Sequence, residues 1–118
     1  MCSWRKTASI LAQASCLACA SRYQSLGRVL FEAWDAGIPV IGGAFSGGAA
    51  ASLKESGGGL LFDRWNPESL AEALLIALTC PQATATEMAK AGFAWVREAT
   101  DPKVYASGMA KIFHDAIL

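Results

Sequence analysis

The sequence predicts an α/β fold built on a parallel sheet of about three strands. Two observations carry this prediction. Short apolar runs alternate with segments in which apolar residues recur at helical spacing, and glycine or proline separates most of them. A strand that is followed each time by a helix is typical of a parallel sheet, because a crossover must bring the chain back before the next strand begins.

The first expected elements are a helix and a strand. The helix covers residues 5–14, with Ile10 and Leu11 on one side of it. The apolar run CLACA at 16–20 is short and is bounded by polar residues. Such a run is expected in a buried strand of a parallel sheet.

A crossover helix and a second strand follow the loop SRYQSL. Gly27 opens the helix, and its inner face is formed by four residues at helical spacing: Val29, Leu30, Ala33 and Trp34. Gly37 stands after the last turn, where a C′ glycine ends a helix. Pro39 then favours an extended backbone for the second strand, at 38–42.

The alternation continues beyond this strand. Residues 48–55 are expected to form a short helix, and 59–62 the third strand. The clearest helix signal is NPESLAEALLIAL, in which leucines recur at every fourth position. Asn66 can cap this helix and Pro67 suits its first turn.

Two further helices complete the chain, near 84–98 and 101–117, and Asp101 caps the second. We therefore expect residues 1–118 to form a single partial domain. Its strand and helix core covers 7–80 and its C-terminal helices cover 81–118. Three strands are few for a doubly wound domain, which usually has five or six. The chain is thus expected to be the second half of a Rossmann-like domain.

Composition excludes two classes of partner. Ten basic residues balance ten acidic ones, and no run of Lys or Arg is present that could neutralise phosphates along a nucleic acid. No apolar run approaches the roughly 20 residues of a membrane span. Apolar residues nevertheless make up 53% of the chain, enough for a buried core or for an apolar surface that meets a partner.

The four cysteines, at positions 2, 16, 19 and 80, are expected to be structural. Cys16 and Cys19 form a C-x-x-C motif within an apolar run, whereas a redox pair would lie at a helix N-terminus. A zinc site would need two more ligands, and the only histidine is His114, expected on an exposed helix face. We predict no metal site. Trp34, Trp65 and Trp95 are expected to anchor the core rather than to stack on a ligand.

The N-terminus leaves two alternatives open. A basic start, an apolar middle and an Ala-x-Ala-like end at Ala20 resemble a secretory signal peptide, which would yield a small secreted protein. Against this, Ser9, Gln13 and Ser15 dilute the apolar middle, and the stretch divides into a helix and a strand. We expect a cytoplasmic protein.

The loop before Gly27 is the expected ligand site. Loops that follow parallel strands gather at the carboxyl edge of the sheet, where ligands bind. A helix that begins at Gly27 turns free N–H groups and a positive dipole end toward that edge, which suits a phosphate. Glu32, on the second turn, can accept two hydrogen bonds from hydroxyl groups, as from a ribose. The alternative is a solvated surface glutamate.

Taken together, ASRYQSLGRVLFEAWDAGIPVIGG, the later Gly-Gly pair, GGLLF and NPESLAEALL resemble a known family. It is the glycosyl transferases group 1 family of nucleotide-sugar-dependent enzymes with the GT-B fold. The register holds at Ser21, Gly27, Glu32, Ala33, Gly37, Pro39, Val40 and Ile41, and continues in Gly47-Gly48, Gly59-Leu60-Leu61 and Leu70-Ala71. The resemblance covers roughly residues 7–118 and implies the second half of the C-terminal, donor-binding domain.

The resemblance also implies an activity and site residues. The activity is retaining transfer of a hexosyl group from a UDP-, GDP- or ADP-sugar to an unknown acceptor, without a metal or other cofactor. The amides of Ser25, Leu26 and Gly27 would lie near the diphosphate, and Glu32 would hold the donor ribose. Gln24 occupies the position of a catalytic glutamate that addresses the donor sugar. The partner would be an N-terminal acceptor domain or another chain.

Several departures keep a second function open. Gln24 carries no charge that would favour a cationic transition state. Ala20 replaces a proline, Leu26 replaces an aromatic residue, and the Gly-Gly loop lacks its glutamate. The family's upstream Arg/Lys pair is missing; Arg22 and Arg28 flank the loop, as surface charges or as phosphate contacts. The chain is therefore either the donor-binding part of a glycosyltransferase, inactive alone, or a non-catalytic module that binds a nucleotide sugar or another protein.

Overall fold

The computed structural model describes residues 3–45, 47–63 and 66–117. Helices and strands alternate along the described chain, as the sequence predicts. In order they are α1 (Trp4–Leu11), β1 (Leu17–Cys19), α2 (Arg28–Asp35), β2 (Val40–Gly43), α3 (Gly48–Ser56), β3 (Gly59–Phe62), α4 (Pro67–Thr79), α5 (Gln82–Ala99) and α6 (Pro102–Ile117).

The strands form one parallel sheet in the order β1-β2-β3. Leu17 pairs with Val40 of β2, and Val40 in turn pairs with Gly59 of β3. This confirms the predicted parallel sheet of three strands. β1 is shorter than the expected 16–20, and β2 begins two residues later than the expected 38–42.

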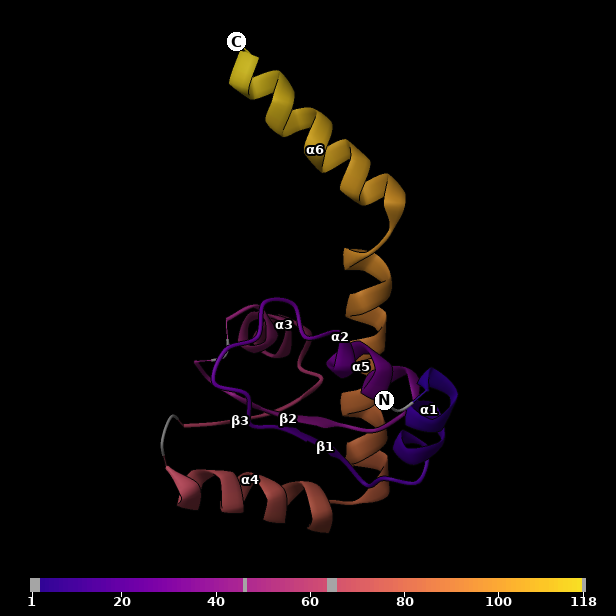
Figure 1. Ribbon diagram of the computed structural model, residues 1–118, viewed down its shortest axis with the longest axis vertical. Coiled ribbons are helices and arrows are strands. Elements are labelled where there is room, and N and C mark those ends of the chain that lie inside the picture. The colour runs from indigo at the N-terminus through magenta and orange to yellow at the C-terminus, as the bar shows by residue number, and fades with distance from the viewer. Residues whose placement is uncertain (1–2, 46, 64–65, 118) are drawn as a thin grey trace.

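Helices cover both faces of the sheet (Figure 1). α4 packs on β2 and β3 from one side, and α2 and α3 lie on the other side with α1 beside α2. α5 packs across α2 and α3, whereas α6 projects away from the body and touches mainly the end of α5. The result is a three-layer α/β arrangement with one protruding helix.

The core is divided between the two faces because neighbouring strand residues point to opposite sides. Val40 belongs to the cluster under α2 and α3, together with Leu30, Trp34 and Leu53. The next residue, Ile41, belongs to the cluster under α4, with Phe62, Ala73 and Ala77. Both Val40 and Ile41 are completely buried.

Trp34 is the main anchor of the first cluster. Its ring passes so close to Gly58 and Gly92 that a Cβ at either position would overlap with it. The indole Nε1 donates a hydrogen bond of 2.8 Å to the Gly58 carbonyl, and the Phe31 ring stacks at 5.9 Å. This confirms the expected role of Trp34; Trp95 packs partly buried beside it, and Trp65 lies outside the described residues.

The helix termini carry the signals that the sequence indicated. Gly37 has a φ of 80°, and the Gly37 and Ile38 amides donate to the Trp34 and Ala33 carbonyls, which closes α2 in a Schellman motif. The Asn66 side chain accepts hydrogen bonds from the first turn of α4. Asp101 accepts from the Lys103 amide at the start of α6.

The prediction that Ile10 and Leu11 lie on one side of the first helix was wrong. Leu11 is buried against α2, but Ile10 is 57% exposed. Adjacent helical residues are separated by about 100° around the axis, and α1 lies at the margin of the fold. α1 therefore buries only a narrow stripe of side chains against α2.

No helix within the described ranges is long and apolar enough to span a membrane.

Candidate functional site

The loops that follow β1 and β2 meet at the carboxyl edge of the sheet. A Cβ on Gly48 would overlap with the carbonyl of Ser25, and one on Gly47 would lie 2.9 Å from the carbonyl oxygen of Gln24. The two backbones therefore touch directly, and only glycine leaves room for this contact. The Gly-Gly pair after β2 thus supports the loop that carries the candidate residues.

All five candidate residues line one open depression of about 550 Å³. Its lining comes from a continuous loop and the first turns of α2: Gln24, Ser25, Leu26, Gly27, Arg28, Val29 and Glu32. Ser25, Leu26 and Glu32 are exposed, whereas Gly27 is buried and Gln24 is partly buried. The residues that the sequence singled out as a group are therefore neighbours in space.

The N-terminus of α2 opens into this depression without a side-chain cap. Gly27 is the N-cap residue, with φ 73° and ψ 53°, and the first helical hydrogen bond runs from the Leu30 amide to its carbonyl at 2.8 Å. α3 begins at the same edge behind another glycine, Gly47, also without a side-chain cap. Amides at such helix starts are available to an anion, and the helix dipole favours one.

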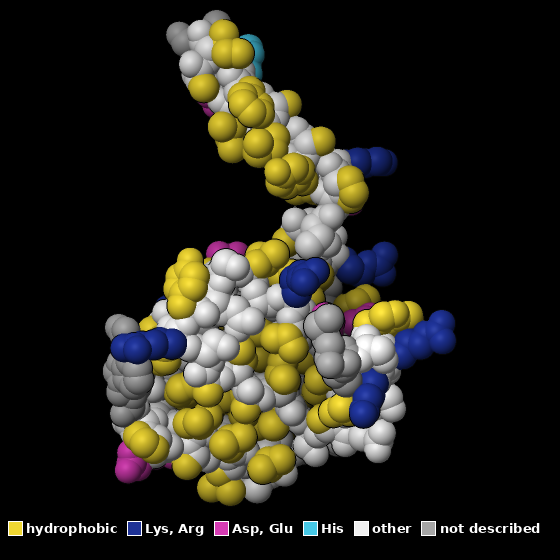
Figure 2. Space-filling model, in the orientation of Figure 1, with side chains coloured by type: hydrophobic (Ala, Val, Ile, Leu, Met, Phe, Trp, Pro, Cys, Tyr) yellow, Lys and Arg dark blue, Asp and Glu magenta, His cyan; other side chains and the backbone are white. Residues whose placement is uncertain are grey.

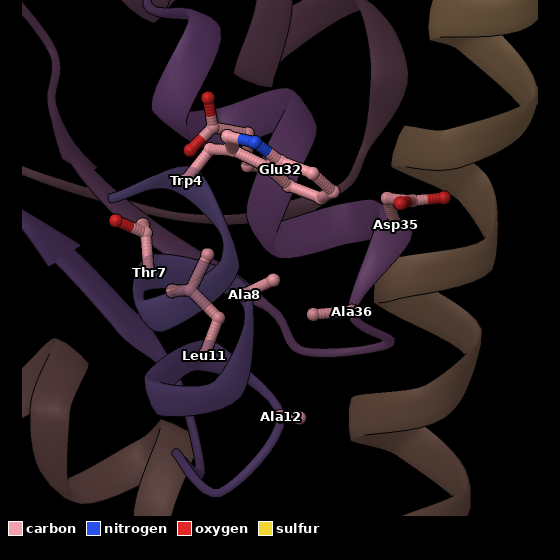
Figure 3. Close-up of a pocket in the computed structure, with 8 residues that line it drawn as sticks. All are labelled: Trp4, Thr7, Ala8, Leu11, Ala12, Glu32, Asp35 and Ala36. Atoms are coloured by element: carbon pink, nitrogen blue, oxygen red, sulfur yellow. The ribbon is translucent and has the colours of Figure 1, made fainter. Parts of the chain in front are cut away.

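Glu32 stands between two hollows. Besides the depression above, it borders a second hollow of about 490 Å³ between α1 and α2. Figure 3 shows the residues that line that hollow: Trp4, Thr7, Ala8 and Leu11 of α1, Glu32 and Asp35 of α2, and Ala12 and Ala36 at the ends of the two helices. Within the described part of the chain, the Glu32 carboxylate has no hydrogen bond or ion pair, so it is available to a ligand.

The Gln24 side chain is held by a hydrogen bond from Cys19 that the sequence did not predict. The Cys19 thiol donates to the Gln24 side-chain oxygen, with 2.8 Å between Sγ and Oε1. Cys19 is the last residue of β1 and is buried. The sequence predicted Cys19 as a small structural residue of the strand and gave no sign of this contact, whose acceptor lies five residues further along the chain. The Ser21 hydroxyl lies 3.6 Å from the same sulfur atom.

The two arginines that flank the loop lie on different sides of it. Both are exposed, and Arg28 lines the depression with Glu32. Arg22 instead borders an apolar hollow of about 440 Å³ on the α4 side, formed with residues such as Phe45, Phe62 and Leu70. Of the two, Arg28 is the cation that faces the α2 N-terminus.

The two cysteines of the C-x-x-C motif differ in burial: Cys19 is buried in β1, whereas Cys16 precedes the strand and is partly buried. Cys16 packs in the cluster under α4 and Cys19 in the cluster under α2, so the sheet separates their sulfur atoms. Both are free thiols, and burial raises the pKa of the Cys16 thiol. Among the described residues, no group of three or more His, Cys, Asp or Glu side chains could hold a metal ion.

Comparisons with known proteins agree with this geometry. The chain matches the family described as "Glycosyl transferases group 1" over residues 2–115. It is also similar to the solved structure of sucrose-phosphate synthase from Thermosynechococcus elongatus, with 27% sequence identity and a TM-score of 0.64. That match covers 85% of this chain and 25% of that chain, so this chain spans about a quarter of the length of the synthase. No curated protein matched. The match over nearly the whole chain shows that this protein, with its three-stranded parallel sheet of the GT-B type, belongs to the glycosyl transferases group 1 family.

Proposed function

We propose that this chain binds the nucleotide-sugar donor of a glycosyl transfer reaction and supplies one side of the transfer site. The observation that carries the proposal is the depression at the α2 N-terminus, which gathers the candidate residues beside an uncapped helix end. Family membership supports a nucleotide-sugar donor. The chain acts as one donor-binding half-domain over 1–118, with 7–80 as its core and 81–118 as its C-terminal helices.

The proposed roles follow from the chemistry of each group. The amides of Ser25, Leu26 and Gly27 bind the diphosphate, because the helix end offers N–H donors and a positive dipole. Glu32 accepts hydrogen bonds from the two ribose hydroxyls. Gln24, which lines the same depression, hydrogen-bonds to the donor sugar.

We propose that retaining hexosyl transfer needs a second polypeptide surface, either an N-terminal acceptor domain or another chain. Orientation of two reactants contributes up to roughly 7–11 kcal/mol to such a reaction. The leaving diphosphate also needs cations, and Arg28 is the positive side chain that lines the depression. Arg28 and the N-terminus of α2 bind the donor diphosphate, whereas the second polypeptide must hold the acceptor. The isolated chain is therefore inactive in transfer.

A second candidate function is a non-catalytic module that keeps nucleotide-sugar binding. The Cys19–Gln24 contact favours it, because one of the two lone pairs of the Gln24 side-chain oxygen already receives the thiol hydrogen bond. What Gln24 then offers a sugar is the second lone pair and the NH₂ group, both neutral. Such groups can bind a hydroxyl, but they do not stabilise positive charge at a sugar carbon.

The test is a binding titration by ligand-observed NMR. UDP, GDP, ADP and their sugar conjugates are titrated into the native chain, Glu32→Ala and the control Glu72→Ala, which removes an exposed glutamate on α4 far from the edge loops. We expect millimolar binding by the native chain and the control. Glu32→Ala should bind at least tenfold more weakly, since hydrogen bonds to a charged group are worth about 1.5–3 kcal/mol each. Equal binding by all three proteins would remove Glu32 from the site, and turnover by the native chain alone would contradict the need for a partner.

We also propose that the protein is cytoplasmic and keeps its first twenty residues. β1 hydrogen-bonds along β2, and Cys19 at its end is buried, so cleavage after Ala20 would remove a strand and uncover the apolar edge of β2. Intact-mass measurement of the protein made in its own cells tests this. A mature chain that starts at Ser21 would overturn the proposal.

A further inference from the structure

The hollow between α1 and α2 and the proposed diphosphate site share Glu32 as a lining residue. Glu32 lines both, so a ligand held by its carboxylate can extend in either direction. The hollow measures about 490 Å³. This lies within the range of about 300–1,000 Å³ that is usual for small-molecule sites. A ligand group that leaves Glu32 on the side away from the helix N-terminus therefore enters a space of suitable size.

Trp4 is the aromatic side chain of this hollow. It stands on the first turn of α1, facing α2 across the groove (Figure 3). Although large and apolar, it is 76% exposed, and the core does not use it. The guanidinium carbon of Arg5 lies over its ring, 5.4 Å from the centroid. This cation–π contact occupies one face of the indole and leaves the opposite face for another planar group.

The backbone around Trp4 is also held in place. Ser3 caps α1 by accepting a hydrogen bond from the Lys6 amide. Leu11, about two helical turns after Trp4, is buried in the core and fixes α1 against α2. The indole thus projects from an anchored helix and not from a free tail.

We propose that the indole of Trp4 stacks on the base of the donor nucleotide, in the hollow between α1 and α2. This inference rests on the proposed function, which puts the diphosphate at the α2 N-terminus and the ribose at Glu32. The base is attached to the ribose on the side opposite the phosphates, so it points along the groove toward Trp4. Stacking on an aromatic ring accepts any base, because every base has a π-face, and a purine overlaps the indole more fully than a pyrimidine.

The experiment compares ligands that differ by the base alone. ADP, UDP and inorganic pyrophosphate are titrated by ligand-observed NMR into the native chain, Trp4→Ala and Trp4→Phe. The control is Ile10→Ala, which removes another exposed apolar residue of α1 outside the hollow. Circular dichroism confirms that each variant keeps its helices. A substitution at so exposed a position as Trp4 is expected to leave the fold intact.

We expect Trp4→Ala to weaken ADP binding by about 5- to 150-fold, with a smaller loss for UDP and none for pyrophosphate. Trp4→Phe should recover most of the affinity, and the base protons of ADP should lose their ring-current shift in Trp4→Ala. Unchanged ADP binding in Trp4→Ala would overturn the inference while the proposed function stands. An equal loss of ADP and pyrophosphate would overturn it as well. A native chain that binds no nucleotide would overturn both.

Discussion

The thiol of Cys19 joins the end of β1 to the loop that carries the candidate site. Its hydrogen bond to Gln24, at 2.8 Å, lies in a partly buried position, where loss of the donor leaves an acceptor unpaired. Such a loss costs about 1–3 kcal/mol.

We predict that Cys19→Ala lowers the free energy of unfolding by about 1–2 kcal/mol and weakens nucleotide binding, because the loop loses its tie to the sheet. Urea denaturation measures the first effect. Cys80→Ala is the matched control, since the Cys80 thiol donates to the Ala77 carbonyl at the C-terminal end of α4. Equal unfolding midpoints for the two variants would show that the Cys19–Gln24 contact contributes nothing.

A second prediction concerns Cys16. Burial raises the pKa of its thiol, so less thiolate is present at any given pH than in a free thiol. We predict that iodoacetamide alkylates Cys16 in the folded chain more slowly than it alkylates glutathione at pH 8. Site-resolved mass spectrometry gives the rate. A rate equal to that of glutathione would contradict the prediction, as would formation of a Cys16–Cys19 disulfide on mild oxidation.

Among the helices and strands, the spacing of apolar residues and the positions of glycine and proline predicted the order along the chain. They did not predict how closely each helix packs on the sheet. α4 shows why. The leucine repeat indicated a helix, yet its completely inward positions are Ala73 and Ala77, while Leu75 and Leu78 are exposed. Alanine lets the helix axis approach β2 and β3 closely. That choice depends on the opposing sheet, which the spacing of apolar residues does not describe.

The candidate site, too, was predicted from the sequence only in part. Glycine and the strand–loop–helix order predicted that the candidate residues of the loop and of α2 gather at the sheet edge, because these signals are local. The Cys19–Gln24 contact and the groove beside Trp4 were not predicted. Trp4 and Glu32 are far apart in the sequence and meet only when α1 packs on α2 through Leu11. Such a meeting is a tertiary event with no signature in either segment.

The contact between the loop before α2 and the start of α3 yields a prediction at this scale. Gly48→Ala places a methyl group on the Ser25 carbonyl, where backbone must move to make room. We expect a loss of at least 2 kcal/mol in unfolding free energy and loss of nucleotide binding. Gly108→Ala is the control, because nothing lies within 4 Å of a Cβ there and the residue is inside α6. It should stabilise its helix by roughly 0.5–1 kcal/mol. Similar effects of the two substitutions would contradict the loop contact.

At the scale of the whole molecule, the protein is more extended than a compact domain of its length. Its radius of gyration is 15.8 Å and its longest extent 53 Å. A compact chain of 118 residues is expected near 13.5 Å. α6 accounts for the difference, since it projects from the body, and none of its described residues is buried (Figure 1).

α6 nevertheless has the composition of a packed helix. Figure 2 shows hydrophobic side chains along its length. Tyr105 and Phe113 are 67% and 60% exposed, and Ile112 is similar. At helical spacing these residues fall on one side, while Lys103, Lys111 and His114 fall on the other. Within the described residues α6 touches mainly the end of α5, so its apolar side is exposed and suits contact with the proposed second polypeptide.

α6 is expected to contribute little to the stability of the fold. Both core clusters draw their described members from residues before Pro102, and α5 rather than α6 packs on α2 and α3. A chain that ends at Thr100 should therefore keep its unfolding free energy within about 0.5 kcal/mol of the full chain, because removing exposed residues changes little. The same truncation should reduce binding of the dye ANS and concentration-dependent association, since the apolar side of α6 is gone. Circular dichroism with urea, ANS fluorescence and analytical ultracentrifugation measure the three effects. Unfolding of the truncated chain would mean that α6 packs on the rest of the fold in solution. Unchanged association would mean that the associating surface lies elsewhere, as on the exposed leucines of α4.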